Sequence, residues 1–274
     1  MIHSLNRIKS LSRIIFLDGL RRHALIGLLL LSLLAEVSGL LFMDFFGHDV
    51  GRASSDFLFS IMWGVGLLFL LFHAVQVIAW DEEKGVIYAL LSRPISRREY
   101  VLGVFVGLAF LLFCLHLLLG ATAYGTLLFI KQSLNEAYFP AFYASHFLLA
   151  WLGLVVMQWV LLAAVMMFSS LVRGGFPVLL LTAAYYGICS GLPVVRESMS
   201  QQLIQEADSG LLYFLQVMTA IFPDFSQLDF KDIVVSSQSL VDVASVFTHF
   251  GVAVLYVALV ITFACHLYTR RDLH

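Results

Sequence analysis

Residues 101–130 read VLGVFVGLAFLLFCLHLLLGATAYGTLLFI, a stretch without one Asp, Glu, Lys or Arg. The hydrocarbon core of a bilayer is about 30 Å thick, and a helix needs about 20 apolar residues to cross it. Backbone amides find no water to bond inside lipid, so such a segment must be helical. This stretch therefore predicts a transmembrane helix and sets the scale for the rest of the chain.

Five further apolar runs are long enough to cross a membrane. The six predicted spans are about 24–46, 56–80, 101–130, 141–170, 176–195 and 244–268. Gly187, Gly191 and Pro193 interrupt the fifth, which is therefore the weakest. Of the 274 residues, 61% are hydrophobic and only 12% are charged, against about 25% charged in soluble domains. We predict an all-α membrane protein in which residues 1–274 form one domain with six transmembrane helices, neither an ordinary soluble enzyme nor a nucleic-acid-binding protein.

Basic residues are distributed unevenly between the two sides of these spans. Twelve of the 16 lysines and arginines fall on the side that holds the N-terminus. The four on the other side are Arg52, Lys131, Arg196 and Lys231. Cytoplasmic loops carry an excess of Lys and Arg, so we expect both termini to be cytoplasmic.

Two segments outside the spans have helical patterns of their own. In residues 1–22, cationic side chains are interleaved with apolar ones at spacings of three and four, which predicts a helix lying in the membrane interface. The alternative is a basic flank that only sets the topology. Residues 196–243, on the outer face between the fifth and sixth spans, contain apolar residues that predict an external or re-entrant helix, pressed on or dipping into the outer leaflet and ended by Pro223.

The most informative connection is 81–100, DEEKGVIYALLSRPISRREY. Its acidic start favours a helix N-terminus, and Pro94 ends the short helix. An apolar stripe at helical spacing is formed by Val86, Ile87, Leu90 and Leu91. An apolar ridge ringed by charges fits a groove in a partner protein; the alternative is a helix lying on the bilayer surface. Ser96 and Glu99 then have the spacing of a capping box for the third span.

The chain offers few candidates for chemistry of its own. No lysine follows a glycine, which excludes a Walker A phosphate loop, and no histidine precedes a glutamate, which excludes the HExxH zinc motif. The three cysteines have no metal-ligand spacing, and we expect neither a metal site nor a catalytic residue. Residues 187–191, GICSG, resemble a nucleophile elbow, but that motif needs a strand, a turn and a helix. Small residues that let helices approach closely are the alternative explanation.

Glu36 is the sharpest polar candidate within a predicted span. Ionisable groups inside a membrane are costly and are functional candidates by default. A carboxyl group there is either protonated or paired. We weigh a role in the substrate pathway against a structural hydrogen bond between helices.

Residues 82–103, EEKGVIYALLSRPISRREYVLG, resemble the signature of type-2 ABC-transporter permeases (ABC-2), in which an acidic helix leads into LLSxP(I/V)SRxE(Y/F)xxG. The stretches FLDGLRRHALIGLLLL at 16–31 and RRDL at 270–273 are similar to other parts of that family. FPDFSQLDFKDIVV at 222–235 resembles the outer loop of its multicopper-enzyme-maturation, NosY-like branch. Val86 and Val104 depart from the usual Thr and Lys.

This resemblance implies a permease subunit that moves a substrate across the bacterial inner membrane. Two such subunits, either two copies or a pair of homologues, would work with two separate cytoplasmic ATPase subunits, surrounded by membrane lipids. ATP and Mg²⁺ would bind to the ATPase, so we expect no cofactor on this chain. Residues 1–22 would be the interfacial elbow helix and 81–93 the coupling helix. The ATPase-binding residues would be Glu82, Glu83, Gly85, Val86, Ile87, Leu90, Leu91 and Arg93.

Two other functions remain open at this point. One is a non-transporting membrane scaffold or mechanotransmission subunit for enzyme maturation, which would use the same ATPase coupling. The other is an intramembrane hydrolase that uses Cys189 or Ser190 with a histidine from a span. It leaves the pattern of residues 81–100 unexplained.

Overall fold

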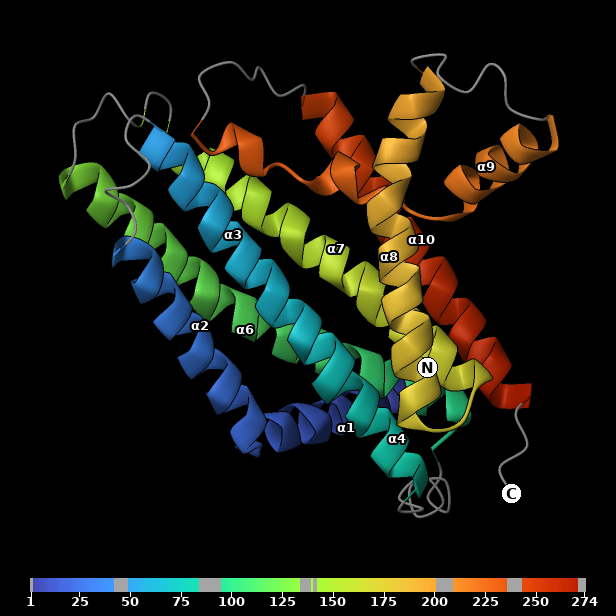
Figure 1. The fold of residues 1–274 in the computed structure, drawn as a ribbon. Coiled ribbons are helices and arrows are strands. Elements are labelled where there is room, and N and C mark those ends of the chain that lie inside the picture. The colour runs from blue at the N-terminus through green and yellow to red at the C-terminus, as the bar shows by residue number, and fades with distance from the viewer. Residues whose placement is uncertain are drawn as a thin grey trace.

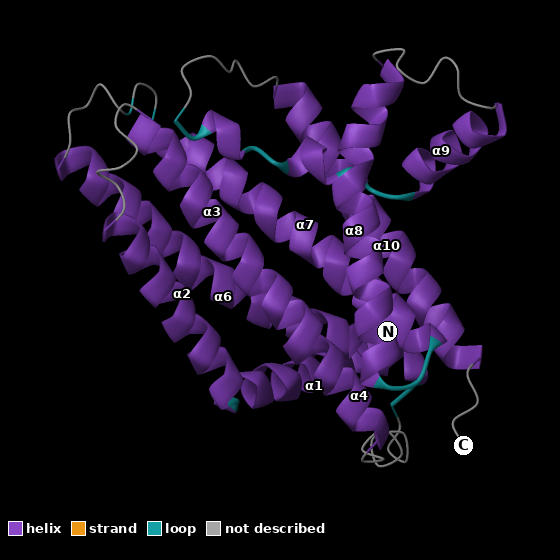
Figure 2. Cartoon of the chain, in the orientation of Figure 1, coloured by secondary structure: helices purple, strands orange, loops and turns teal. Residues whose placement is uncertain are grey.

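The computed structural model describes residues 2–41, 49–83, 95–133, 139, 142–200, 209–235 and 243–270. These residues are almost entirely helical, and none of them is in a strand (Figure 2). The helices are α1 (Ile2–Arg21), α2 (His23–Leu41), α3 (Val50–Leu68), α4 (Val75–Glu83), α6 (Arg97–Ser133), α7 (Ala144–Leu171), α8 (Gly175–Ser200), α9 (Ser209–Ile221) and α10 (Val243–Arg270). Two 3₁₀ turns, η5 (Phe225–Leu228) and η6 (Lys231–Ile233), lie between α9 and α10.

The predicted all-α membrane fold is confirmed. Among the described residues, five helices are long and apolar enough to cross a membrane, and α2 contributes a shorter apolar stretch, Leu25–Gly39. The second crossing joins α3 and α4 through a π-helical turn at Phe69–Ala74, a local widening that the sequence pattern did not predict. Together these helices give about six spans.

The fifth span differs from the prediction at its outer end. We expected it to end near residue 195, weakened by glycines and a proline, but α8 continues through Pro193 to Ser200. Proline lacks the amide hydrogen that would bond to the carbonyl of Cys189, yet the helix is not broken there. The loss of one backbone bond is therefore tolerated within α8.

α7 lies at the centre of the bundle. In its most apolar stretch 78% of the residues are buried, against 22% in α10 and 28% in α8, which therefore lie at the periphery of the bundle. α7 contacts α6, α8 and α10, and the η5 and η6 turns rest on its outer end. Gly153 permits that last contact, because a Cβ there would collide with the backbone carbonyl of Leu228. Figure 1 shows α9 and the two turns gathered at one end of the bundle.

The N-terminal helix lies across the opposite end of the bundle (Figure 1). α1 forms where an interfacial helix was predicted, and it packs along the first turns of α6. Leu11 and Ile15 are buried there and lie over Gly103 and Gly107, whose missing side chains let the two helices approach closely. The helix is thus part of the folded core as well as a basic flank.

Candidate functional site

Only the start of the predicted partner-binding loop falls within the described residues. Glu82 and Glu83 lie at the end of the described part of α4, so the acidic residues continue that helix, whereas we had expected them to open a new one. The helix of the second crossing thus runs past Trp80 into the charged residues, because α-helical bonding does not require apolar side chains. The remaining residues of the set, Gly85, Val86, Ile87, Leu90, Leu91 and Arg93, lie outside the described residues.

The N-terminus of α6, which follows the loop, is fixed by several contacts. The predicted capping box of α6 is confirmed: the Ser96 amide donates to Glu99 Oε2 at 2.8 Å, and the Glu99 amide donates to Ser96 Oγ at 3.3 Å. Arg7 of α1 lies 3.6 Å from the same carboxylate. These contacts tie the exit of the loop to the N-terminal helix.

The C-terminal helix meets the same point. Arg97 Nη1 donates to the backbone carbonyl of Thr269 at 3.2 Å. The rings of Tyr100 and Tyr268, both buried, stack with their centroids 5.7 Å apart. The exit of the loop is therefore anchored to α1 and α10 at once, and a force on the loop would reach both helices.

The entry of the loop is held by the turn between α7 and α8. Gly174 has φ of 89°, a left-handed conformation that favours glycine. Its neighbour Gly175 packs so closely on α4 that an added Cβ would lie 3.2 Å from the Ala79 Cβ. The short α7–α8 turn therefore braces the stem of the loop.

Glu36 is buried, with 3% of its surface exposed, on the face of α2 toward α6. Its Oε1 lies 3.3 Å from Thr122 Oγ1, which also lies 2.9 Å from the Leu119 carbonyl oxygen. The single hydroxyl hydrogen of Thr122 is shared between these acceptors. The structure therefore pairs Glu36 with a neighbouring helix, the geometry of a structural hydrogen bond.

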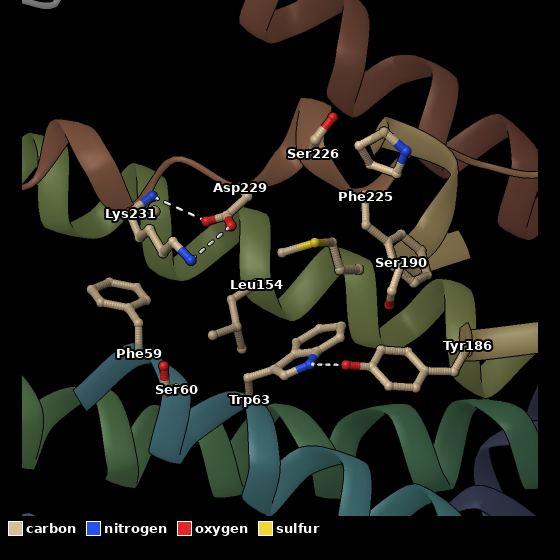
Figure 3. Close-up of a pocket in the computed structure, with 13 residues that line it drawn as sticks. Phe59, Ser60, Trp63, Leu154, Tyr186, Ser190, Phe225, Ser226, Asp229 and Lys231 are labelled. Carbon is tan, nitrogen blue, oxygen red and sulfur yellow. Dashed lines mark hydrogen bonds and ion pairs between the residues drawn. The ribbon is translucent and has the colours of Figure 1, made fainter. Parts of the chain in front are cut away.

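A cavity of about 310 Å³ opens at the end of the bundle opposite α1. It lies between α3, α7 and α8, and the η5–η6 segment covers it (Figure 3). Its lining residues are Phe59, Ser60, Trp63, Ala150, Leu154, Met157, Tyr186, Ser190, Pro193, Phe225, Ser226, Asp229 and Lys231. Its size is at the lower end of the range for small-molecule pockets, roughly 300–1,000 Å³.

The two ends of this cavity differ in chemistry. At the inner end, Trp63 Nε1 donates to the Tyr186 hydroxyl at 3.1 Å (Figure 3). At the outer end, Lys231 Nζ lies 3.4 Å from Asp229 Oδ2, and both side chains are partly exposed. The cavity is therefore an apolar, aromatic slot with an ion pair at its mouth.

The segment that covers the cavity is fixed to α8 by a second ion pair. The Arg196 guanidinium bonds to the carboxylate of Asp224 and to the backbone carbonyl of Thr219. Burial by itself raises the pKa of Asp224, but hydrogen bonds from Ser226 and the charge of Arg196 outweigh it and bring the pKa below its usual value. The carboxylate is therefore ionised at neutral pH and holds the segment in place.

Residues 47–273 match the family described as ABC-2 family transporter protein. The chain belongs to this family. No protein in the curated set matched it. The matched region of this ABC-2 protein runs from the residues before α3 to the end of α10, and includes the loop at 81–93 and the cavity. It leaves out α1 and α2, and with them Glu36.

The nucleophile-elbow pattern does not form an elbow in this ABC-2 protein. Cys189 and Ser190 lie inside continuous helix, in α8, with no strand or turn before them. No group of three histidine, cysteine or carboxylate side chains comes together as a metal site in the described part of the chain. The hydrolase alternative thus lacks the local geometry that the motif requires.

Sequence reasoning did not find the cavity. Its residues come from three spans and the η5–η6 segment. No sequence motif marks them, because their neighbours along the chain are ordinary apolar or small residues. The one available signal was the 222–235 segment, which resembles a family loop and supplies Phe225, Ser226, Asp229 and Lys231 to the wall.

Proposed function

We propose that this ABC-2 protein is the permease subunit of an ABC transporter in the bacterial inner membrane. It moves or exports a substrate with energy from a separate cytoplasmic ATPase, which binds ATP and Mg²⁺. Two permease subunits, identical or homologous, assemble with two ATPase subunits. The observation that carries the proposal is the family match over 47–273 in a bundle of about six spans.

The connection 81–93 acts as the coupling helix in this proposal. Its support is the anchoring of both ends: α4 is braced by the α7–α8 turn, and the start of α6 is tied to α1 and α10. A displacement of the loop by the ATPase is then passed to several spans at once. Two packings of the bundle move cargo only if they bind it with different affinity.

The orientation places α1, the loop and the C-terminus in the cytoplasm, and α9 with the η turns outside. Its support is the distribution of basic residues, because twelve of the 16 lysines and arginines fall on the side of α1, and only Arg52, Lys131, Arg196 and Lys231 fall on the other. Cysteines introduced at Ser92 and at Gln227 should label from opposite faces of intact cells, Ser92 only after permeabilisation. Labelling of both from one face would refute the topology.

Co-purification tests the assembly. The tagged permease, expressed with the ABC ATPase encoded beside it, should retain the ATPase through purification and raise its hydrolysis in lipid. Hydrolysis without movement of any cargo into inverted vesicles would favour the scaffold function over transport. Failure of every neighbouring ATPase to bind would contradict both.

A further inference from the structure

The cavity under the η5–η6 segment has the shape of a slot along the helix axes. On α7 its lining residues run from Ala150 to Met157, and on α8 from Tyr186 to Pro193. Seven residues at a rise of 1.5 Å correspond to a depth of roughly 10 Å on each wall. The lining residues of the two helices thus span the same depth, so the slot extends along both helices.

The inner end of the slot is closed and apolar. Trp63 and Tyr186 are the innermost lining residues of α3 and α8, and their hydrogen bond joins the two helices there. Above them the walls are Leu154, Met157 and the ring of Phe225, which lies 6.1 Å from the Trp63 ring, centroid to centroid. An apolar chain entering the slot gains burial along its whole length, at roughly 25 cal/mol per Å².

The outer end carries both signs of charge. Lys231 Nζ and Asp229 Oδ2 face each other across 3.4 Å, as Figure 3 shows, and beside them Arg52 pairs with Asp232 at 3.3 Å. Asp56 of α3 interacts electrostatically with these four groups, so the mouth has three carboxylates and two basic groups. An anionic headgroup would meet the carboxylates, and a purely cationic one would meet Lys231 and Arg52. A zwitterionic headgroup can pair its anionic group with Lys231 and its cationic group with Asp229, so that each side chain keeps a partner of opposite charge.

The volume favours an apolar part of one chain. A cavity of about 310 Å³ lies at the lower end of the range for small-molecule pockets, roughly 300–1,000 Å³. That size favours a single short alkyl chain over the paired chains of a membrane phospholipid.

We propose that this cavity binds one single-chain amphiphile with a zwitterionic headgroup, its chain in the slot and its two charges on Asp229 and Lys231. Only the role of this ligand as transported cargo rests on the proposed function. Binding can be measured on the chain without the ATPase, so the binding proposal and the proposed function can fail separately.

Native mass spectrometry of the purified chain measures this binding directly. The probe is lysophosphatidylethanolamine with a 12-carbon chain, and the comparison ligand is lysophosphatidylglycerol with the same chain, which is anionic. We expect the zwitterionic probe to form a one-to-one adduct at a concentration about fivefold lower than the anionic ligand requires. The reason is that an exposed ion contact contributes up to about 1 kcal/mol. Equal affinity for the two ligands would overturn the proposal that Asp229 and Lys231 bind a zwitterionic headgroup.

Two substitutions on α8 separate the slot from the lipid-facing surface. Ser190→Phe places a ring in the cavity and should remove the adduct, whereas Ile188→Phe adds the same ring at an exposed position outside the lining and should leave it unchanged. An undiminished adduct in Ser190→Phe would overturn the proposal. Should that variant fail to fold, the exposed-site double variant Asp229→Asn/Lys231→Gln must keep the adduct and lose the headgroup preference; a retained preference would overturn the proposal equally.

Discussion

The packing of α1 on α6 makes a sharp prediction at Gly107. A Cβ at this position would lie 2.9 Å from the backbone carbonyl oxygen of Ser12 and 3.0 Å from the Ile15 Cβ. Since the first neighbour is backbone, α1 itself must move when Gly107 is replaced by alanine. Overpacking of this kind typically costs about 1–3 kcal/mol.

Helix propensity does not mask this cost. Alanine stabilises a helix by about 1 kcal/mol relative to glycine, but α6 is helical whether or not α1 is docked on it. The gain in helix propensity is therefore the same whether α1 is docked or undocked, and it cancels. Only the steric clash changes the equilibrium between the two states. A penalty of about 2 kcal/mol corresponds to a factor of about 30 in that equilibrium.

Hydrogen–deuterium exchange of α1 in lipid nanodiscs measures the effect. In Gly107→Ala the buried amides of α1 should exchange about 30-fold faster, because local opening sets their exchange. Gly125→Ala is the matched control on the same helix, as nothing lies within 4 Å of its added Cβ. Unchanged exchange in Gly107→Ala, or equal acceleration in both variants, would refute the packing of α1 on α6.

Three further predictions follow from single contacts. Ser96→Ala removes the capping hydroxyl of α6 and should lower the free energy of unfolding by about 1 kcal/mol in thermal melts, while Ser10→Ala, on the exposed face of α1, should not. Asp224→Asn should lower the melting temperature at pH 7, because the depressed pKa of Asp224 makes its contribution present above about pH 4. That difference from wild type should vanish as the pH falls through the folded-state pKa, and a constant difference would contradict the ion pair. Glu36→Gln should keep assembly and most of the activity, since an amide oxygen can still accept from Thr122; complete loss of activity with intact assembly would assign Glu36 to the substrate pathway.

Much of the architecture follows from local sequence patterns. The apolar runs, the interleaved residues of 1–22 and the Ser96–Glu99 pair each encode an element whose energy is set within a few residues. The span of 101–130 is recognisable because lipid accepts no unpaired backbone. These features could be predicted because solvent and neighbouring turns decide them.

Features that depend on contacts between distant segments could not be predicted. The π-helical turn at Phe69–Ala74 and the passage of α8 through Pro193 depend on how neighbouring helices pack. The pairing of Trp63 with Tyr186 joins residues more than a hundred positions apart. The acidic residues 81–83 favour a helix start by themselves, but in the structure they continue α4, because a helix that has already formed can extend through charged residues.

Release of the ATPase by a change in the loop tests the central claim most directly. Leu90 lies in the apolar stripe of 81–93 and Glu82 at its charged rim. Truncation of an interface anchor commonly costs about 2 kcal/mol or more, and rim charges cost much less. Leu90→Asp should therefore abolish co-purification of the ATPase or uncouple its hydrolysis from transport in lipid, while the melting temperature of the bundle and the behaviour of Glu82→Gln stay close to wild type. If Leu90→Asp keeps both ATPase binding and coupled activity, residues 81–93 are not the coupling element and the proposed function loses its main support.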